Sequence, residues 1–371
     1  MIGRVIEVGR GAVNTTKSGV AGRIAGRLMY KPLIYGYSNA RIHGMKSVLM
    51  SQSALEELAE LPSVPSIISA LERTHYKEDL AALSLKYSGA ELVERALARN
   101  YSRTCKKVMK FTPADGRSTV EAYLEHWDVN NLRTILVGKE LKKPREEIES
   151  QLVPVGQMGP IEISSLIDAP TLEDALAVIR THRYGAVLWH ARSQGFKKVL
   201  STLDRQYYIN VQKKVTSADP KAVGVLRMLK TQLDGKNLST ILRLKVAQYP
   251  KEKVLPHIIE GGRFSPREIN DMIDAHSVEE AVKIAGRKYD LGSALDYYAR
   301  NKMVSAFEIA FSQQIAQKGL AQFRKSELSV GTVIGFLMLK EIAMENIRKI
   351  MRGKEFGLTP DEIGQMIVDI S

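Results

Sequence analysis

The chain has 371 residues, of which 44% are hydrophobic and 26% charged, a balance that fits a folded globular protein and excludes a disordered one. Its 54 Lys and Arg residues against 41 Asp and Glu leave a formal charge of +13, which favours an anionic partner. The single cysteine, Cys105, excludes an intrachain disulfide, and the most apolar run, residues 330–339, is too short for the roughly 20 residues of a membrane span.

The chain begins with a basic segment, because residues 1–31 carry six Lys or Arg side chains against one acid. We predict that residues 1–32 are an extension to the folded body. A second basic cluster covers residues 99–117. Each cluster is typical of a solvated helix face or a flexible arm.

Short helices with a polar N-cap are predicted at three places along the chain. At each place a Ser or Thr precedes apolar residues at helical spacing, and the segment runs on to a tyrosine. The three predicted caps and their tyrosines are Ser63 with Tyr76, Thr171 with Tyr184, and Ser277 with Tyr289.

A longer motif recurs three times, as NLRTILVGK from Asn131, NLSTILRLK from Asn237 and NIRKIMRGK from Asn346. Apolar residues follow each Asn at the spacing of an amphipathic helix. The separations of the three Asn residues, 106 and 109 positions, indicate an internal structural repeat. The segment YSNARIHGMKS, residues 37–47, looks like a degenerate fourth copy.

A third signal is a proline followed by Glu-Ile, at Pro160, Pro266 and Pro360. Ser265 and Thr359 precede the last two prolines, which is the chemistry of a helix start with proline in the first turn. We expect these three prolines to begin equivalent helices.

Together these signals predict an all-α fold of three similar helical units around a pseudo-threefold axis, forming a funnel with a central cavity. Because the tail has the Asn helix but ends before a capped helix, we expect it to complete a unit with the N-terminal region. The predicted units are residues 33–112 plus 326–371, residues 113–219, and residues 220–325.

The repeated polar residues have a structural interpretation. Asn131 and Asn237 lie on the apolar stripe of their helices, three positions after Asp128 and Asp234. A buried polar group of this kind fixes helix register, because misregistered packing leaves it without a hydrogen-bond partner. Binding of a ligand by these residues is the alternative. At Asn346 the equivalent of the Asp is Ala343.

No catalytic or cofactor site is predicted. The seven histidines form no metal-binding pattern, and no nucleophile, base and oxyanion site can be assembled. The segment GAVNTTKS, residues 11–18, has Thr16 where a phosphate-binding loop needs its second glycine. We therefore expect neither a cofactor, a metal ion nor enzymatic activity.

The sequence resembles the C subunit of the archaeal-type (A/V-type) rotary ATP synthase, the counterpart of the d subunit of the eukaryotic vacuolar ATPase. The segments that carry the resemblance are YSNARIHGMKSVLM, DVNNLRTILVGK, LDGKNLSTILRLK and LKEIAMENIRKIMRGK, within residues 33–370. The first 31 residues depart from the family pattern.

The resemblance implies a funnel-shaped, non-catalytic subunit of the central stalk, present as a single copy. Its partners would be the proteolipid rotor ring in the membrane and the central shaft subunits of the D and F type. The protein would link ATP synthesis or hydrolysis to proton or sodium transport, at the cytoplasmic face of the cell membrane as a peripheral protein. Its basic surface could also contact anionic lipid headgroups.

A helical-repeat protein that binds nucleic acid is the alternative function, suggested by the charge of +13. Only 6% of the residues are aromatic, and most fall on apolar stripes, so stacking platforms for bases are scarce. We therefore expect no nucleic-acid partner.

Overall fold

The computed structural model describes residues 34–371, apart from 219–222 and 325–328. The predicted N-terminal extension, residues 1–32, lies outside the described residues. In the described part of the chain all regular structure is helical, without a strand, which confirms the all-α prediction. None of the described helices is long and apolar enough to cross a membrane.

The middle of the chain sets the pattern of long and short helices. A long helix is followed by four short ones and a second long helix, which packs against the first. The helices are α6 (Ala114–Glu140), α7 (Arg145–Ser150), α8 (Pro160–Asp168), α9 (Leu172–Val178), α10 (Gly185–Ala191) and α11 (Phe196–Ala218), with 3-10 turns η1 (Ile179–Thr181) and η2 (Arg192–Gln194).

The next segment repeats this order, and its two long helices again pack together. Its helices are α12 (Val223–Val246), α13 (Lys251–Val254), the 3-10 turn η3 (Leu255–His257), α14 (Pro266–Asp274), α15 (Val278–Ala285), α16 (Gly292–Asn301) and α17 (Ser305–Arg324).

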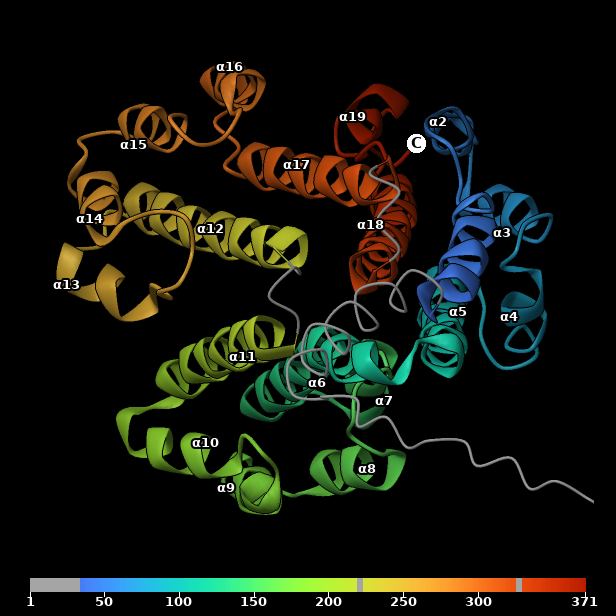
Figure 1. Cartoon of the computed structure of the whole chain (residues 1–371), viewed down its shortest axis with the longest axis horizontal. Coiled ribbons are helices and arrows are strands. Elements are labelled where there is room, and N and C mark those ends of the chain that lie inside the picture. The colour runs from blue at the N-terminus through green and yellow to red at the C-terminus, as the bar shows by residue number, and fades with distance from the viewer. Residues whose placement is uncertain (1–33, 219–222, 325–328) are drawn as a thin grey trace, which may run out of the picture.

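The two ends of the chain supply the remaining helices. Residues 34–46 are helical, and α2 (Gln52–Glu60), α3 (Val64–Leu71), α4 (Lys77–Ala81) and α5 (Gly89–Phe111) follow. The tail forms α18 (Val330–Glu355) and α19 (Pro360–Gly364). Helix α18 packs against α5, α2 and α3, and α19 packs against α2, so Figure 1 shows the red end of the chain beside the blue one.

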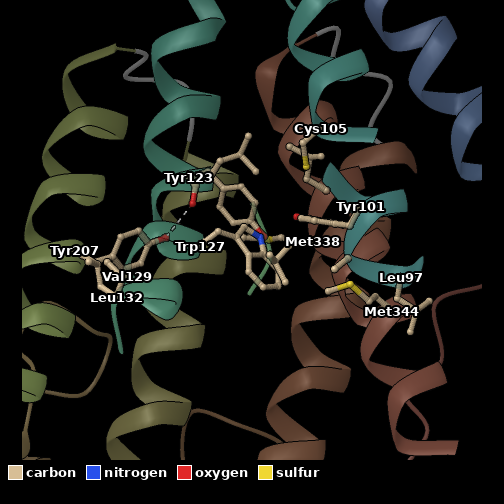
Figure 2. Close-up of a cluster of buried hydrophobic side chains, with 14 of the residues drawn as sticks. Leu97, Tyr101, Cys105, Tyr123, Trp127, Val129, Leu132, Tyr207, Met338 and Met344 are labelled. Carbon is tan, nitrogen blue, oxygen red and sulfur yellow. Dashed lines mark hydrogen bonds between the residues drawn. The ribbon is translucent and has the colours of Figure 1, made fainter. Parts of the chain in front are cut away.

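Figure 1 also shows the three pairs of long helices in three different regions of the molecule: α6 with α11, α12 with α17, and α18 with α5. Where α5, α6, α11 and α18 meet, large buried side chains such as Tyr101, Trp127 and Met338 pack together (Figure 2). The α12–α17 segment has a separate hydrophobic cluster that includes Leu242, Tyr289 and Phe307.

The three helices that carry the repeated Asn end in the same way. Eleven positions after the Asn, the backbone turns left-handed, at Lys142 (φ 52°), Gln248 (φ 56°) and Gly357 (φ 71°). The amide of the following residue donates to the carbonyl five residues earlier: Lys143 donates to Gly138 and Leu358 donates to Gly353, both at 2.8 Å. This is the hydrogen-bond pattern of a Schellman motif, which satisfies carbonyls that the helix end leaves open.

Candidate functional site

Each repeated Asn ties its long helix to the connecting segment that follows. The side chain of Asn131, only 2% exposed, donates to the Val153 carbonyl (2.8 Å) and accepts from the Val153 amide (2.9 Å). Asn237 makes the same two bonds to Ile259, at 2.7 and 3.0 Å. Asn346 makes them to Val368, at 2.8 and 3.0 Å.

The partner is 22 residues after the Asn in all three cases. One side-chain amide therefore satisfies both backbone groups of a buried residue in a non-helical segment. These groups would otherwise have no partner inside the core. The contact is geometric support for a register-fixing role, and no ligand is needed to explain why the Asn is buried.

The preceding Asp residues hold the next part of the same connecting segments. Asp128 accepts from the amides of Gln157 (2.7 Å) and Met158 (3.0 Å). Asp234 accepts from the amides of Arg263 (2.8 Å) and Phe264 (3.4 Å). Burial raises the pKa of both carboxyl groups, and the hydrogen bonds that they accept oppose this rise.

A glycine lies against each Asp. A Cβ atom on Gly156 would be 1.9 Å from Asp128 Oδ1, and one on Gly262 would be 1.9 Å from Asp234 Oδ1. No side chain fits between the carboxylate and the backbone that it holds. The two glycines are therefore part of the same device, although the sequence motifs do not include them.

The tyrosines after the capped helices also contact the long helices. Tyr184 donates to Glu125, and Tyr289 donates to Asp234 at 2.5 Å. The hydroxyl of Tyr76 accepts from Lys340 of α18 at 3.1 Å. Glu125 and Lys340 both lie six positions before the Asn of their helix, so the same place in the repeat carries opposite charges.

The predicted caps lie at helix starts. The hydroxyls of Ser63, Thr171 and Ser277 accept from the amides of Ser66 (3.4 Å), Asp174 (3.1 Å) and Glu280 (3.1 Å), which satisfies an open donor of the first turn. Pro160 and Pro266 occupy the first turns of α8 and α14, two helices of nine residues each.

We expected Pro360 to begin a helix equivalent to those that begin at Pro160 and Pro266, but the contacts around it favour another match. A Cβ on Gly353 would meet Ile363 of α19 at 2.6 Å, as one on Gly138 would meet Ile148 of α7 at 2.5 Å. Helix α19 thus matches α7, not α8. Helices α8 and α14 each have nine residues and precede a capped helix. In the N-terminal part of the chain this place is taken by α2, which also has nine residues and precedes the capped helix α3.

The segment of residues 37–47 is helical as far as residue 46. Its Asn39 donates to Thr332 Oγ1 of α18 at 3.4 Å, and Tyr35 from the same helix donates to Asp115 at 3.0 Å. The helix therefore adds to the packing around the start of α6 and of α18. The Asn helix that packs against α2, α3 and α5 is therefore α18, and not the helix of residues 34–46.

In the first two copies of the motif, the last Lys serves as a second tie. Lys139 donates to the carbonyls of Ile167 and Ala169 (2.5 Å to the latter). Lys245 donates in the same way to Ile273 (2.8 Å) and Ala275 (2.6 Å). A cation at the C-terminal ends of α8 and α14 satisfies open carbonyls and is favourable for the helix dipole.

A cavity of about 480 Å³ lies where the long helices come together. All three Asn helices contribute to its wall, α6 through His126, α12 through Lys236 and α18 through Glu341, and α11 and α17 complete it. It is the place at which the three parts of the chain share one concave surface. We therefore take it as the candidate functional site.

Ion pairs cross the wall of this cavity. Asp204 of α11 pairs with Arg133 of α6 and with Lys236 of α12 (2.6 Å), so one carboxylate joins three helices. Glu308 of α17 pairs with Arg243 of α12 at 2.6 Å. Burial lowers the pKa of Lys236, and Asp204 partly offsets this.

A further pair joins α6 to α18. His126 Nε2 is 3.2 Å from the Glu341 carboxylate. His126 Nδ1 donates a hydrogen bond to the Tyr123 carbonyl at 2.7 Å, so this nitrogen carries a proton. Burial alone would lower the pKa of His126, but the Glu341 carboxylate, together with the Tyr123 carbonyl and the Asp128 charge, outweighs burial and raises this pKa. Tyr123 also donates to Glu341, at 2.9 Å.

The arrangement of the cavity suits the binding of a partner. Its charged side chains are engaged with one another across helices, which braces the wall. Close-packed helices tied in this way transmit strain with little deformation. The wall therefore offers a stiff concave surface of mixed polarity to a partner.

Comparison with known proteins identifies the family. The model of the ATP synthase (C/AC39) subunit family matches residues 38–366. The chain belongs to this family. The C subunit of the A-type ATP synthase of Thermococcus onnurineus is 26% identical to this C/AC39 chain over 370 residues, covering 97% of the chain and 98% of that protein.

Other relatives of the C/AC39 chain carry the same name. The C subunit of the A-type ATP synthase of Methanocaldococcus jannaschii is 24% identical over 349 residues, 91% of the chain and 86% of that protein. That of Methanosarcina barkeri is 26% identical over 341 residues, 91% of the chain and 93% of that protein.

Proposed function

We propose that this C/AC39-family chain is a non-catalytic rotor subunit of an A/V-type ATP synthase. It couples the central shaft to the membrane rotor ring, so that ATP synthesis or hydrolysis is linked to ion transport. The cavity to which all three Asn helices contribute carries the proposal, because a shaft can transmit torque to a wall whose helices are joined by ion pairs. The near full-length match to C subunits of A-type ATP synthases supports it.

We further propose that the chain folds as three units around a pseudo-threefold axis, as a funnel. The three identical Asn contacts and the packing of α18 on α5 support this division. The unit made of both chain ends closes the array, and the cavity is the seat of the shaft. The partners are the proteolipid ring and the D- and F-type shaft subunits, with one copy of this chain at the cytoplasmic face of the membrane.

A cysteine placed in the cavity tests this proposal. The native Cys105 is buried, and burial raises the pKa of its thiol, so its own reaction with cross-linkers is slow. Ser312→Cys places a thiol on the cavity wall, and Ser193→Cys places one on an exposed outer turn as the matched control. We expect only the cavity thiol to cross-link to a shaft subunit in the assembled complex.

Removal of the protein from the complex gives a functional test. Complexes without this chain should hydrolyse ATP in the soluble head and fail to pump ions. Retained pumping would refute the coupling role. Cross-linking of the outer thiol but not of the cavity thiol would instead refute the cavity as the seat of the shaft.

A further inference from the structure

A second cavity, of about 540 Å³, lies between α4, α5 and α18 and shares no lining residue with the candidate functional site. Four cationic side chains line it: Lys77, Arg103, Lys107 and Lys340. One lining carboxylate, Glu78, and one buried behind the wall, Asp79, oppose them, which leaves a surplus of two positive charges when Lys340 is protonated. We call this cavity the α4–α5–α18 pocket.

Lys340 is the unusual member of this set. It is only 3% exposed, and its Nζ donates to His75 Nε2 (2.7 Å) and to Tyr76 Oη (3.1 Å), both neutral partners. His75 is neutral because burial and the Lys340 charge lower its pKa to about 3. Among the described residues no carboxylate forms an ion pair with Lys340.

The nearby acid does not compensate this charge directly. Asp79 accepts from Asn100 (2.8 Å) and Arg103 (3.0 Å), and it acts on Lys340 only through space. Burial accordingly lowers the pKa of Lys340 to about 7. A buried cation without a counterion is costly, and an anion that enters the pocket would remove this cost.

The repeat shows that the charge is not required by the fold. At the equivalent position α6 carries Glu125, which binds Tyr184, and α12 carries Thr231. An acid or a neutral hydroxyl therefore fills this place in the other two copies. Only the copy beside a pocket with cations on its rim has a lysine.

We propose that the α4–α5–α18 pocket binds a phosphorylated anion, with Lys340 at its base and Lys77, Arg103 and Lys107 at its rim. Lysine and arginine are the usual partners of phosphate oxygens. Arg103 already donates to Glu78 and to Asp79, so it adds positive charge at the rim while the lysines supply the donors. The anion is either a soluble phosphate compound or the headgroup of a phosphorylated lipid, since both present the same oxygens. This site goes beyond the proposed coupling role and does not depend on it.

Titration of the full-length chain with inorganic pyrophosphate tests the site. Lys340→Met removes the charge and keeps the apolar stem, so the variant should fold, as circular dichroism can verify. We expect its affinity to fall about tenfold to a hundredfold, the loss of a charge-assisted hydrogen bond. Lys283→Met removes one charge from an exposed site on α15 and should change affinity by less than about twofold.

A rim variant keeps the test decisive if Lys340→Met fails to fold. Lys107 is exposed, so Lys107→Gln should leave the fold intact and weaken pyrophosphate binding by about threefold or more. No binding by the native chain at physiological salt would overturn the proposal. Equal losses in Lys107→Gln and Lys283→Met would also overturn it, because they indicate general surface attraction.

Vesicles distinguish the two sources of the anion. Binding to phosphatidylcholine vesicles that contain phosphatidic acid, with competition by pyrophosphate and loss in Lys340→Met, assigns the site to a lipid headgroup. Pyrophosphate binding without such vesicle binding assigns it to a soluble phosphate compound. Vesicle binding that is insensitive to both pyrophosphate and Lys340→Met counts against the pocket.

Discussion

The tie between Asn131 and Val153 predicts a large and local loss of stability in Asn131→Ala. Val153 is 1% exposed, and both of its backbone groups bond to the Asn131 side chain. Removing this side chain leaves one buried donor and one buried acceptor without partners. Each such group costs about 1–3 kcal/mol, so the two together should cost about 2–6 kcal/mol.

The neighbouring Asn130 provides the matched control. It is exposed on the same helix, so Asn130→Ala removes the same side chain without leaving a buried group unpaired. Surface substitutions of this kind change stability by about 0.5 kcal/mol or less. The difference between the two variants therefore isolates the buried contact from helix propensity.

Hydrogen exchange with mass spectrometry, combined with urea unfolding, is the suitable assay. In Asn131→Ala the amide of Val153 should lose protection, because its acceptor is gone, while peptides from α14 to α17 keep theirs. The urea midpoint should fall in the same variant and stay unchanged in Asn130→Ala. Equal behaviour of the two variants would refute the register-fixing role of the buried Asn.

Three further predictions concern other contacts of the repeat. Gly156→Ala should destabilise the chain by about 1–3 kcal/mol in urea unfolding, because the new methyl group collides with the held Asp128 carboxylate. The unfolding free energy of the native chain, relative to that of Lys340→Met, should rise as the pH increases from 7 to about 10.5, because Lys340 binds more protons in the unfolded chain than in the folded one. Parallel curves of unfolding free energy against pH for the two proteins would contradict this. Arg348→Met should cost about 1–3 kcal/mol and loosen α18 from α5, because Arg348 pairs with Glu94 at 2.6 Å.

Two positions control for these substitutions. A Cβ on Gly159 would meet no atom within 4 Å, so Gly159→Ala carries only the cost of alanine at the N-cap of α8 and should cost less than about 1 kcal/mol. Arg352 is 64% exposed and lies 3.4 Å from the same Glu94, so Arg352→Met should cost less than about 1 kcal/mol. If either control matches its partner variant, the assigned contact is not the cause of the loss.

The helices were predictable because their signals are local. A Ser or Thr cap and an apolar stripe lie within one helix, and Ser63, Thr171 and Ser277 all accept the expected amide. The repeated Asn helix was visible for the same reason. A contact partner 22 residues away was not, because Val153, Ile259 and Val368 bond through their backbone and share no diagnostic side chain.

The match of Pro360 shows how a local signal can mislead. A proline followed by Glu and Ile indicates a helix start, and α19 does begin there. The same chemistry suits any helix start, so it does not identify which helix of the repeat it begins. The tertiary pairs Gly353–Ile363 and Gly138–Ile148 carry that information, and they become visible only in the structure.

Charge at the cavities was equally hidden from the sequence. The wall of the candidate functional site uses Asp204, Lys236 and Glu308, which fall in separate helices, and neither Asp204 nor Glu308 belongs to a repeated motif. Lys340 looks like one more surface lysine until its burial is known. A sequence shows the net charge of a chain, and only the fold shows which charges lose their water.

The pairing of the two chain ends can be explained by the apolar surface that a repeat array exposes at its ends. A linear array exposes an apolar face at each terminal repeat and needs a polar cap there. Here α18 covers α5, and Lys340 meets Tyr76 across 264 positions, so the terminal helices cover each other. The entropic cost of closing a loop grows only with the logarithm of its length. A contact between the two ends of the chain therefore costs only moderately more than a contact between near neighbours. The apolar faces buried by this closure then stabilise the contacts between the first and the last helices of the chain.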